Sequence, residues 1–157
     1  MKIKLLYIGK ADSDNLQKAI EDYVKKINFY AAFEIIPIPY LKNCKAMSFQ
    51  EQKEKEGELF LKKFDTSDYV VLLDEHGKEY TSLQFSAQMQ QYMNSGTKTL
   101  VFVIGGAYGF SETVYKRANA KLSLSKMTFP HIVTRLIFTE QLYRAFTILK
   151  GEPYHHE

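Results

Sequence analysis

The chain has 157 residues, 45% of them hydrophobic and 25% charged, which is enough apolar material for a core and too much for a disordered segment. This length predicts a single domain over residues 1–157. Cys44 is the only cysteine, which excludes an intrachain disulfide and a cysteine zinc cluster and favours the reducing cytoplasm. No apolar run approaches the ~20 residues of a membrane span, and the alternating start lacks the apolar run of a secretory signal.

The formal net charge of +3 conceals an uneven distribution. Fourteen of the 18 acidic residues precede Tyr80, and Glu112 is the only one between Tyr80 and Thr139. The same stretch carries six basic residues: Lys98, Lys116, Arg117, Lys121, Lys126 and Arg135. A locally cationic half favours nucleic acid as partner over a membrane surface, because no cationic amphipathic stretch stands alone.

The first elements in chain order are a strand, a helix and a second strand. The alternation of polar and apolar residues predicts a strand over Lys2–Ile8. Asp12-Ser13-Asp14 is typical of a helix N-cap, and apolar residues then recur at helical spacing through Ile27. Phe33–Ile38 reads as a strand ended by the prolines at 37 and 39.

The next segment is a loop over residues 39–47, followed by a charged helix. Ser48-Phe49-Gln50-Glu51 resembles a capping box and opens a helix that we expect to reach Lys63. The charge run over Glu51–Glu58 is interpreted as a solvated helix face. Tyr69–Asp74 then predicts a short buried strand, which Gly77 turns.

The second half continues the alternation. Ser82 is expected to cap a helix to about Asn94, before a strand over Thr99–Ile104. Ser111 is expected to cap a helix to about Asn119, before a short strand over residues 121–124.

A last helix is expected from Pro130 to about Lys150, with Gly151 and Pro153 ending it. It is apolar nearly all round, so we expect burial on two sides, within the fold or against a second subunit. Glu140 and Arg144 lie one turn apart and could form an ion pair; the alternative is that Arg144 points at a phosphate.

Helices alternating with strands predict an α/β fold with a mainly parallel sheet flanked by helices. Ligands of such sheets bind beyond the carboxyl ends of the strands. Three of these ends carry loop residues, namely Leu73-Asp74, Ile104-Gly105-Gly106 and Leu124-Ser125-Lys126. If their strands are neighbours, the three ends should meet in space.

Two loops carry the candidate chemistry. Three glycines, Gly105, Gly106 and Gly109, fit neither a P-loop nor a dinucleotide fingerprint, and favour a ligand site or a chain crossing. Residues 123–131 could hold a purine between apolar side chains and backbone groups, or could be an ordinary strand-to-helix connection. His76 and His131 are isolated from other metal ligands, so no metal site is expected. The aromatic and histidine tail would, on its own, usually be frayed.

Several separated motifs, taken together and in order, resemble one known family. They are Val103-Ile104-Gly105-Gly106 with Gly109, Leu122-Ser123-Leu124-Ser125, Thr128-Phe129-Pro130-His131, Glu140 to Ala145 and Pro153-Tyr154-His155. The resemblance is to the ribosomal RNA large-subunit methyltransferase H family, in the SPOUT class of α/β-knot methyltransferases. It covers essentially the full length, including residues 54–58.

The resemblance implies S-adenosylmethionine as methyl donor and N3 of a pseudouridine in the 23S ribosomal RNA of the large subunit as acceptor, on the assembled ribosome. It also implies a C-terminal trefoil knot, which pattern reading alone would not propose because knots are rare. An obligate homodimer is implied as well, with the tail folding over the site from the same subunit or from the partner. A non-catalytic RNA- or ribosome-binding module and a transfer RNA methyltransferase are the alternatives.

The family's functional residues can be transferred onto matching positions of this sequence. The implied cofactor-binding residues are Leu73, Gly105, Leu124, Ser125, Lys126, Met127, Thr128 and Phe129. The implied substrate-binding residues are His131, Arg144, Tyr154 and His155, of which the last three are the candidate catalytic residues. His155 is expected to accept a proton or to orient the substrate. His156 stands where the family often has a basic residue, which puts a phosphate contact there in doubt.

Overall fold

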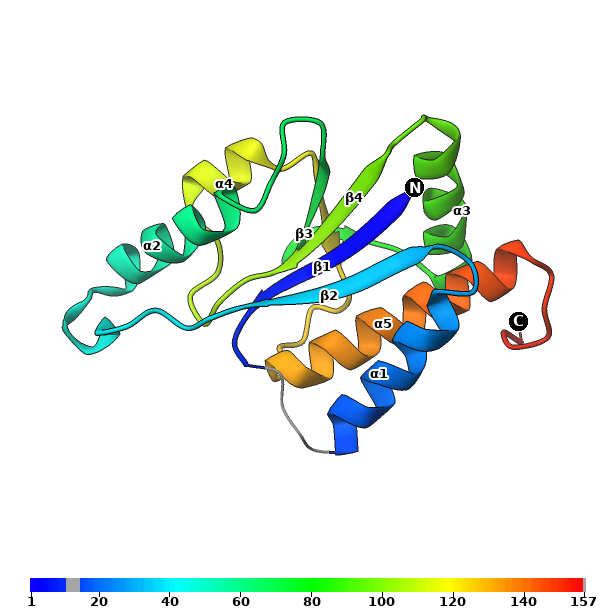
Figure 1. Cartoon of the computed structure of the whole chain (residues 1–157), viewed down its shortest axis with the longest axis horizontal. Coiled ribbons are helices and arrows are strands. Elements are labelled where there is room, and N and C mark those ends of the chain that lie inside the picture. Colours follow the sequence, from blue (N-terminus) through cyan, green and yellow to red (C-terminus); the bar gives the residue numbers. More distant parts are fainter. Residues whose placement is uncertain (11–14, 157) are drawn as a thin grey trace.

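The computed structural model describes residues 1–10 and 15–156 (Figure 1). Within this part of the chain, five strands form one sheet in the order β2-β1-β4-β3-β5, and each neighbouring pair is parallel. The strands are β1 (Lys2–Ile8), β2 (Ala32–Ile38), β3 (Tyr69–Glu79), β4 (Thr99–Ile104) and β5 (Ala120–Ser123). The expected α/β class with a parallel sheet is confirmed.

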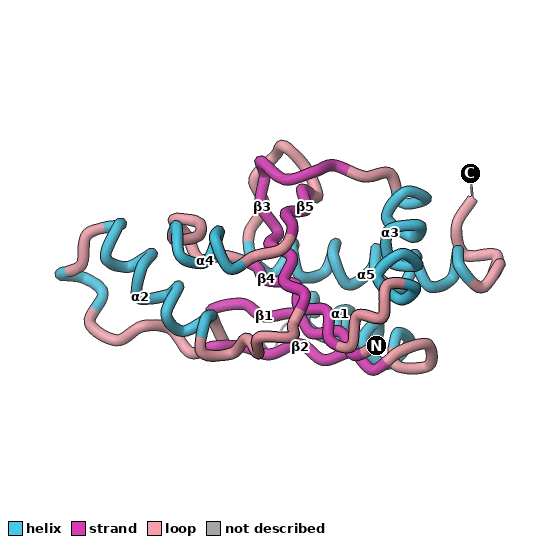
Figure 2. The backbone as a smooth tube through the Cα atoms, turned by 90° about the horizontal axis from the view of Figure 1, so that it is seen from above, coloured by secondary structure: helices cyan, strands magenta, loops and turns pink. Residues whose placement is uncertain are grey.

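Helices cover both faces of the sheet, so the central strands are apolar on both sides (Figures 1 and 2). On one face lie α1 (Asn15–Ile27), α3 (Ser82–Asn94) and α5 (His131–Leu149). On the other lie α2 (Phe49–Leu61) and α4 (Glu112–Arg117). Alternate residues of β4 belong to the two cores: Phe102 contacts the α5 side, and Val101 and Val103 contact the α2 side.

Helix α5 is buried against the sheet and between α1 and α3, where Phe138 and Leu142 are fully enclosed. Near its start, a strip of apolar side chains is only half-buried; it consists of Ile132, Val133, Leu136 and Ile137. The expected burial on two sides is therefore only partly met within this chain: Ala145 and Phe146 in the second half are buried, whereas Ile148 and Leu149 are half-buried like the strip near the start.

The predicted end of β2 at Ile38 is confirmed, and the strand begins one residue before the predicted start, at Ala32. Pro37 lies inside β2 because this is an edge strand, where the N–H that proline lacks costs no ladder bond. The prediction for β3 was wrong in extent. Strand β3 continues past Asp74 and Gly77 to Glu79, with an irregularity that pairs both Leu73 and Lys78 with Leu122. A Cβ on Gly77 would lie 2.7 Å from the backbone nitrogen of Leu122, so only glycine lets these two strands approach so closely.

Helix ends mostly follow the predicted signals. Ser48 and Ser111 accept hydrogen bonds from the backbone N–H groups of Glu51 and Val114, as expected of N-caps. Helix α3 is capped by Thr81 rather than Ser82, in a capping box with Gln84. The predicted N-cap at residues 12–14 lies outside the described residues. The 39–47 loop contains a short 3₁₀ helix, Cys44–Ala46.

The remaining boundaries differ from the predicted ones by one or two residues. Helices α2 and α4 end at Leu61 and Arg117, each two residues before the predicted end. Strand β5 begins and ends one residue early, at Ala120 and Ser123. Such shifts are ordinary because helix and strand ends carry weak local signals.

The charged run of α2 is only partly a solvated face, so that prediction was wrong at its centre. Glu51, Glu54, Lys55 and Glu58 are exposed, but Glu56 and Gly57 are buried. A Cβ on Gly57 would lie 2.4 Å from Oγ of Ser111, which shows how closely α2 approaches the start of α4. The run conceals one buried carboxyl group.

Candidate functional site

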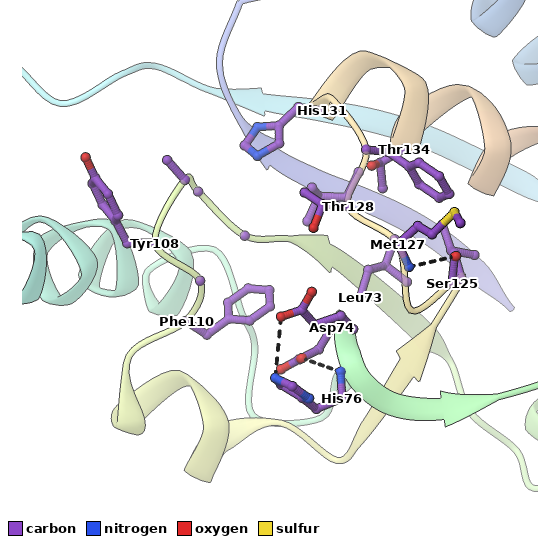
Figure 3. A pocket seen from close by; sticks show the side chains of 18 of the residues that line it. Leu73, Asp74, His76, Tyr108, Phe110, Ser125, Met127, Thr128, His131 and Thr134 are labelled. Carbon is purple, nitrogen blue, oxygen red and sulfur yellow. Dashed lines mark hydrogen bonds and ion pairs between the residues drawn. The ribbon is translucent and has the colours of Figure 1, made fainter.

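A cavity of about 500 Å³ opens where β4 and β5 end, beside the irregularity within β3 (Figure 3). It is lined mainly from three segments: residues Leu73 to His76 within β3, the glycine loop from Gly105 to Phe110, and the loop from Leu124 to Phe129. These segments meet because β3 lies between β4 and β5 in the sheet. The expectation that the three strand ends converge is confirmed.

The glycine loop after β4 is a tight turn. Gly106 and Gly109 form an antiparallel bridge, with the N–H of Gly109 donating to the carbonyl of Gly106 at 3.1 Å. Gly109 has φ +84°, a conformation that favours glycine. A Cβ on Gly105 would lie 3.1 Å from the Phe110 ring. The loop therefore presents backbone to the cavity, and side chains at these positions would strain it or crowd Phe110.

The middle of β3 brings polar groups to the cavity wall. The backbone N–H of His76 donates to Oδ1 of Asp74 at 2.9 Å (Figure 3). The other carboxylate oxygen of Asp74 accepts a hydrogen bond from the hydroxyl of Tyr115. Burial raises the pKa of Tyr115, and this hydrogen bond raises it further, so the phenol stays a donor.

The loop from Ser123 to Pro130 is held by its own hydroxyl groups. Ser123 Oγ donates to the carbonyl of Ser125 at 3.1 Å, and Ser125 Oγ accepts from the N–H of Met127 at 2.9 Å (Figure 3). Lys126 is the exception among the predicted cofactor residues, because it does not line the cavity. Its side chain is 85% exposed and its ammonium lies 3.8 Å from Glu79. Its side chain therefore faces solvent rather than the ligand.

His131, the first residue of α5, also lines the cavity. Burial lowers the pKa of its imidazole, and the nearby positive charge of Arg135 lowers it further. Arg135 is itself buried, with its guanidinium 4.0 Å from the ring centroid of Tyr7. His131 is therefore neutral near pH 7 and able to accept a hydrogen bond.

The C-terminal tail is anchored rather than frayed. Arg144 forms the expected ion pair with Glu140, its Nε 3.0 Å from Oε1, and its NH1 lies 3.1 Å from Nδ1 of His155. The hydroxyl of Tyr154 donates to Glu140 at 3.1 Å and lies 3.3 Å from that of Tyr23. Arg144, Tyr154 and His155 thus form one cluster, as their transfer from the family implies.

The structure does not bring this cluster to the cavity of its own chain. His131 and Arg144 are thirteen residues apart on α5, a rise of roughly 20 Å along the helix. The tail lies at the far end of α5 from the carboxyl ends of β1 and β4 (Figures 1 and 2). The four predicted substrate residues are therefore split, with His131 at the cavity and the other three away from it.

Sequence reasoning missed several residues that line the cavity, including Glu75, His76, Tyr108 and Tyr115. Glu75 and His76 follow the strand end that was recognised, so the unexpected extension of β3 is the reason. Tyr115 comes from α4, and no motif marks it.

In the described residues, no three histidine, cysteine, aspartate or glutamate side chains are grouped as metal ligands. None of the helices in this same part of the chain has the length and apolar character that crossing a membrane requires.

The sequence of this chain matches a family model and several named proteins over nearly its full length. Residues 1–155 match the family model described as "Predicted SPOUT methyltransferase". Proteins from Flavobacterium johnsoniae, Parabacteroides distasonis and Bacteroides thetaiotaomicron are 58%, 57% and 55% identical over all 157 residues of this chain and the whole of each relative. Each carries the name ribosomal RNA large subunit methyltransferase H. This chain belongs to the SPOUT methyltransferase family.

Proposed function

We propose that this protein transfers a methyl group from S-adenosylmethionine to N3 of a pseudouridine in the 23S ribosomal RNA of the large subunit, in the cytoplasm. The names of its relatives and its family support the reaction. The observation that carries the proposal is the cavity formed by three convergent strand ends, one of them a glycine loop that presents bare backbone.

The residues around the cavity suit an adenosyl ligand. The cavity volume of about 500 Å³ lies within the ~300–1,000 Å³ usual for small-molecule sites. Leu73, Leu124 and Phe129 offer apolar surface for the faces of a purine, and the two loops offer backbone groups for its edge. We assign donor binding to Leu73, Gly105, Leu124, Ser125, Met127, Thr128 and Phe129, and to Lys126 through its backbone alone.

S-adenosylmethionine supplies an activated methyl group, so the protein's task is to place the acceptor nitrogen in line and let its proton leave. Neutral His131, at the cavity, is suited to accept a hydrogen bond from the substrate. Arg144 can only donate, so Nδ1 of His155 accepts from it and the proton of the neutral imidazole sits on Nε2. We assign His155, which Arg144 holds in place, the task of orienting the base through one of its carbonyl oxygens. The charge of Arg144 would stabilise the anion that develops.

The separation within one chain supports a homodimer in which the partner supplies the tail. The ~20 Å between His131 and Arg144 keeps the tail cluster from its own cavity. The half-buried apolar strip from Ile132 to Ile137 offers a surface for a second copy. We infer that each site joins the cavity of one subunit to the partner subunit's Arg144, Tyr154 and His155, and that the chain carries the C-terminal knot of its class.

The function can be tested by binding and by mass spectrometry of RNA. S-adenosylmethionine and S-adenosylhomocysteine should each raise the melting temperature, because they bind only the native state. The 23S RNA of a deletion strain should lack one methylated pseudouridine, and purified protein should restore it on 70S ribosomes. No stabilisation by either ligand would favour a non-catalytic binding module. Loss of a methyl group from transfer RNA alone would identify the other alternative.

A further inference from the structure

The buried carboxyl group of Glu56 has no part in the mechanism above. Glu56 lies on α2, and its side chain does not line the cavity. It is only 5% exposed, whereas Glu54 and Glu58 on the same helix are exposed. A buried carboxyl group in an otherwise solvated charge run calls for a specific reason.

The carboxyl group of Glu56 lies directly against Gly106. A Cβ built on Gly106 would lie 2.4 Å from Oε1 of Glu56 and 2.8 Å from its Cδ, closer than any real side chain tolerates. Gly106 itself lines the cavity with its backbone. Gly106 therefore borders both the cavity, through its backbone, and the carboxyl group of Glu56.

The oxygen nearest to Gly106 is also the one without a partner. Within the described residues, Oε1 of Glu56 is buried and accepts no hydrogen bond. Burial raises the pKa of this carboxyl, and a hydrogen bond with Gln52 only partly opposes the rise. Such a group is costly to bury, and its position behind a ligand-facing loop indicates use rather than packing alone.

Glu56 is held in place by its own helix. Gly57, the next residue, lies so close to the cap of α4 that an added Cβ would be 2.4 Å from Oγ of Ser111. Ser111 directly follows the glycine loop and fixes the start of α4 through the N–H of Val114. Helix α2 therefore forms a rigid support beneath the loop, and the Glu56 side chain fills the space between them.

We propose that Glu56 is a positioning residue: through its contact with Gly106, it holds the glycine loop in the position in which the loop backbone binds the methyl donor. The inference rests on the proposed function, because it concerns the same donor site. It assigns to Glu56 an effect on donor affinity through the loop and no contact with substrate.

The first test compares three substitutions by calorimetry with S-adenosylhomocysteine. Glu56→Ala removes the support and should weaken binding about tenfold, or about 1.4 kcal/mol. Glu56→Gln keeps the shape of the side chain and should bind within about threefold of wild type. Glu58→Ala, an exposed carboxyl on the same helix, is the matched control and should bind as wild type does. Melting curves without ligand establish that each variant is folded.

The second test is a double-mutant cycle between the two contacting residues. Gly106 does not have a positive φ, and the three atoms nearest to an added Cβ all belong to Glu56, so a collision with Glu56 is the main obstacle to alanine there. Gly106→Ala should weaken binding, and adding Glu56→Ala should relieve the collision, so the combined loss should be smaller than the sum of the two. Glu56→Asp, which withdraws the carboxyl by one methylene, can replace Glu56→Ala throughout if the latter does not fold.

The outcomes separate this inference from the proposed function. The role of Glu56 is supported if three results are found together. The wild-type protein binds S-adenosylhomocysteine, the glutamine variant keeps the affinity that the alanine variant loses, and the losses of affinity in the Gly106–Glu56 cycle do not add. Undiminished binding by the alanine or aspartate variant, equal losses in the alanine and glutamine variants, or additive losses would overturn it while leaving the donor site intact. If the wild-type protein binds neither S-adenosylmethionine nor S-adenosylhomocysteine, the proposed function fails and this role falls with it.

Discussion

His131 should make the stability of the protein depend on pH in a defined window. Its pKa is lowered in the folded state, so the unfolded chain binds more protons below about pH 6.5, its ordinary value. Stability should therefore be complete above that pH and fall as the pH drops towards the lowered folded value, by at most about 1.4 kcal/mol per pH unit. Urea unfolding of wild type and His131→Asn between pH 5 and 8 measures this.

The difference between the two proteins isolates the histidine. The raised pKa of Glu56 has the opposite effect on stability, but it is present in both proteins and cancels. His131→Asn should lose the slope below pH 6.5 and match the pH dependence of wild type above it. Parallel curves throughout the range would show that His131 titrates as it does in the unfolded chain.

Lys126 and Met127 are neighbours that should differ in their effect on donor binding. Both side chains are largely exposed, but Met127 lines the cavity whereas the ammonium of Lys126 lies 3.8 Å from Glu79. Lys126→Ala should leave the Kd for S-adenosylhomocysteine within about twofold, and Met127→Ala should raise it several-fold by removing apolar contact, roughly 1 kcal/mol. Calorimetry on both variants checks this, and a large loss in Lys126→Ala would place that side chain at the ligand after all.

At single residues, sequence reasoning succeeded where the backbone decides and failed where a side chain's direction decides. The glycines at 105, 106 and 109 were recognised because their spacing requires close approach of backbone. For Lys126, motif transfer gave a position in the loop but not the direction of its side chain, which does not line the cavity. Glu56 was misjudged because its burial depends on a loop fifty residues away, which no local charge pattern reveals.

Among the elements, the long strand β3 depends on Gly77. Its missing side chain allows the backbone of β5 to pass within contact, so Gly77→Ala should force the strands apart. We expect a loss of about 2–3 kcal/mol in the free energy of unfolding, as for overpacking in a core. Gly96→Ala is the control: its φ of +77° is strained for alanine but the space around it is open, so about 1 kcal/mol is expected. Denaturant unfolding of both variants tests the contrast.

The elements themselves were predictable because periodicity, caps and glycines agreed along most of the chain. The alternation of apolar strands with capped helices gave the parallel class, and the order β4-β3-β5 then placed three loops together. The continuation of β3 beyond Gly77 was not predictable, since a glycine after a buried run is also the usual mark of a turn. Pairing of Lys78 and Glu79 with β5 is what makes this segment a strand rather than a turn.

For the molecule as a whole, the distance between cavity and tail is the property that sequence motifs could not supply. Motif transfer names His131, Arg144 and His155 together, but α5 separates the first from the others by about 20 Å. If a partner closes this distance, two inactive chains should complement each other. One chain ends at Pro153 and so lacks Tyr154 and His155; the other carries Thr128→Trp, which fills the cavity near Thr128 (Figure 3).

Each defective chain alone should be inactive, since every site in its homodimer lacks either a tail or an open cavity. After the two are mixed and allowed to exchange subunits, half of the dimers should be mixed, and each should contain one complete site. Methylation should therefore recover to about one quarter of the wild-type rate, because a two-fold dimer has two equivalent sites. If the tail served its own cavity, no mixed dimer would hold a complete site and the mixture would stay inactive. Full activity of the shortened chain by itself would instead remove Tyr154 and His155 from the reaction.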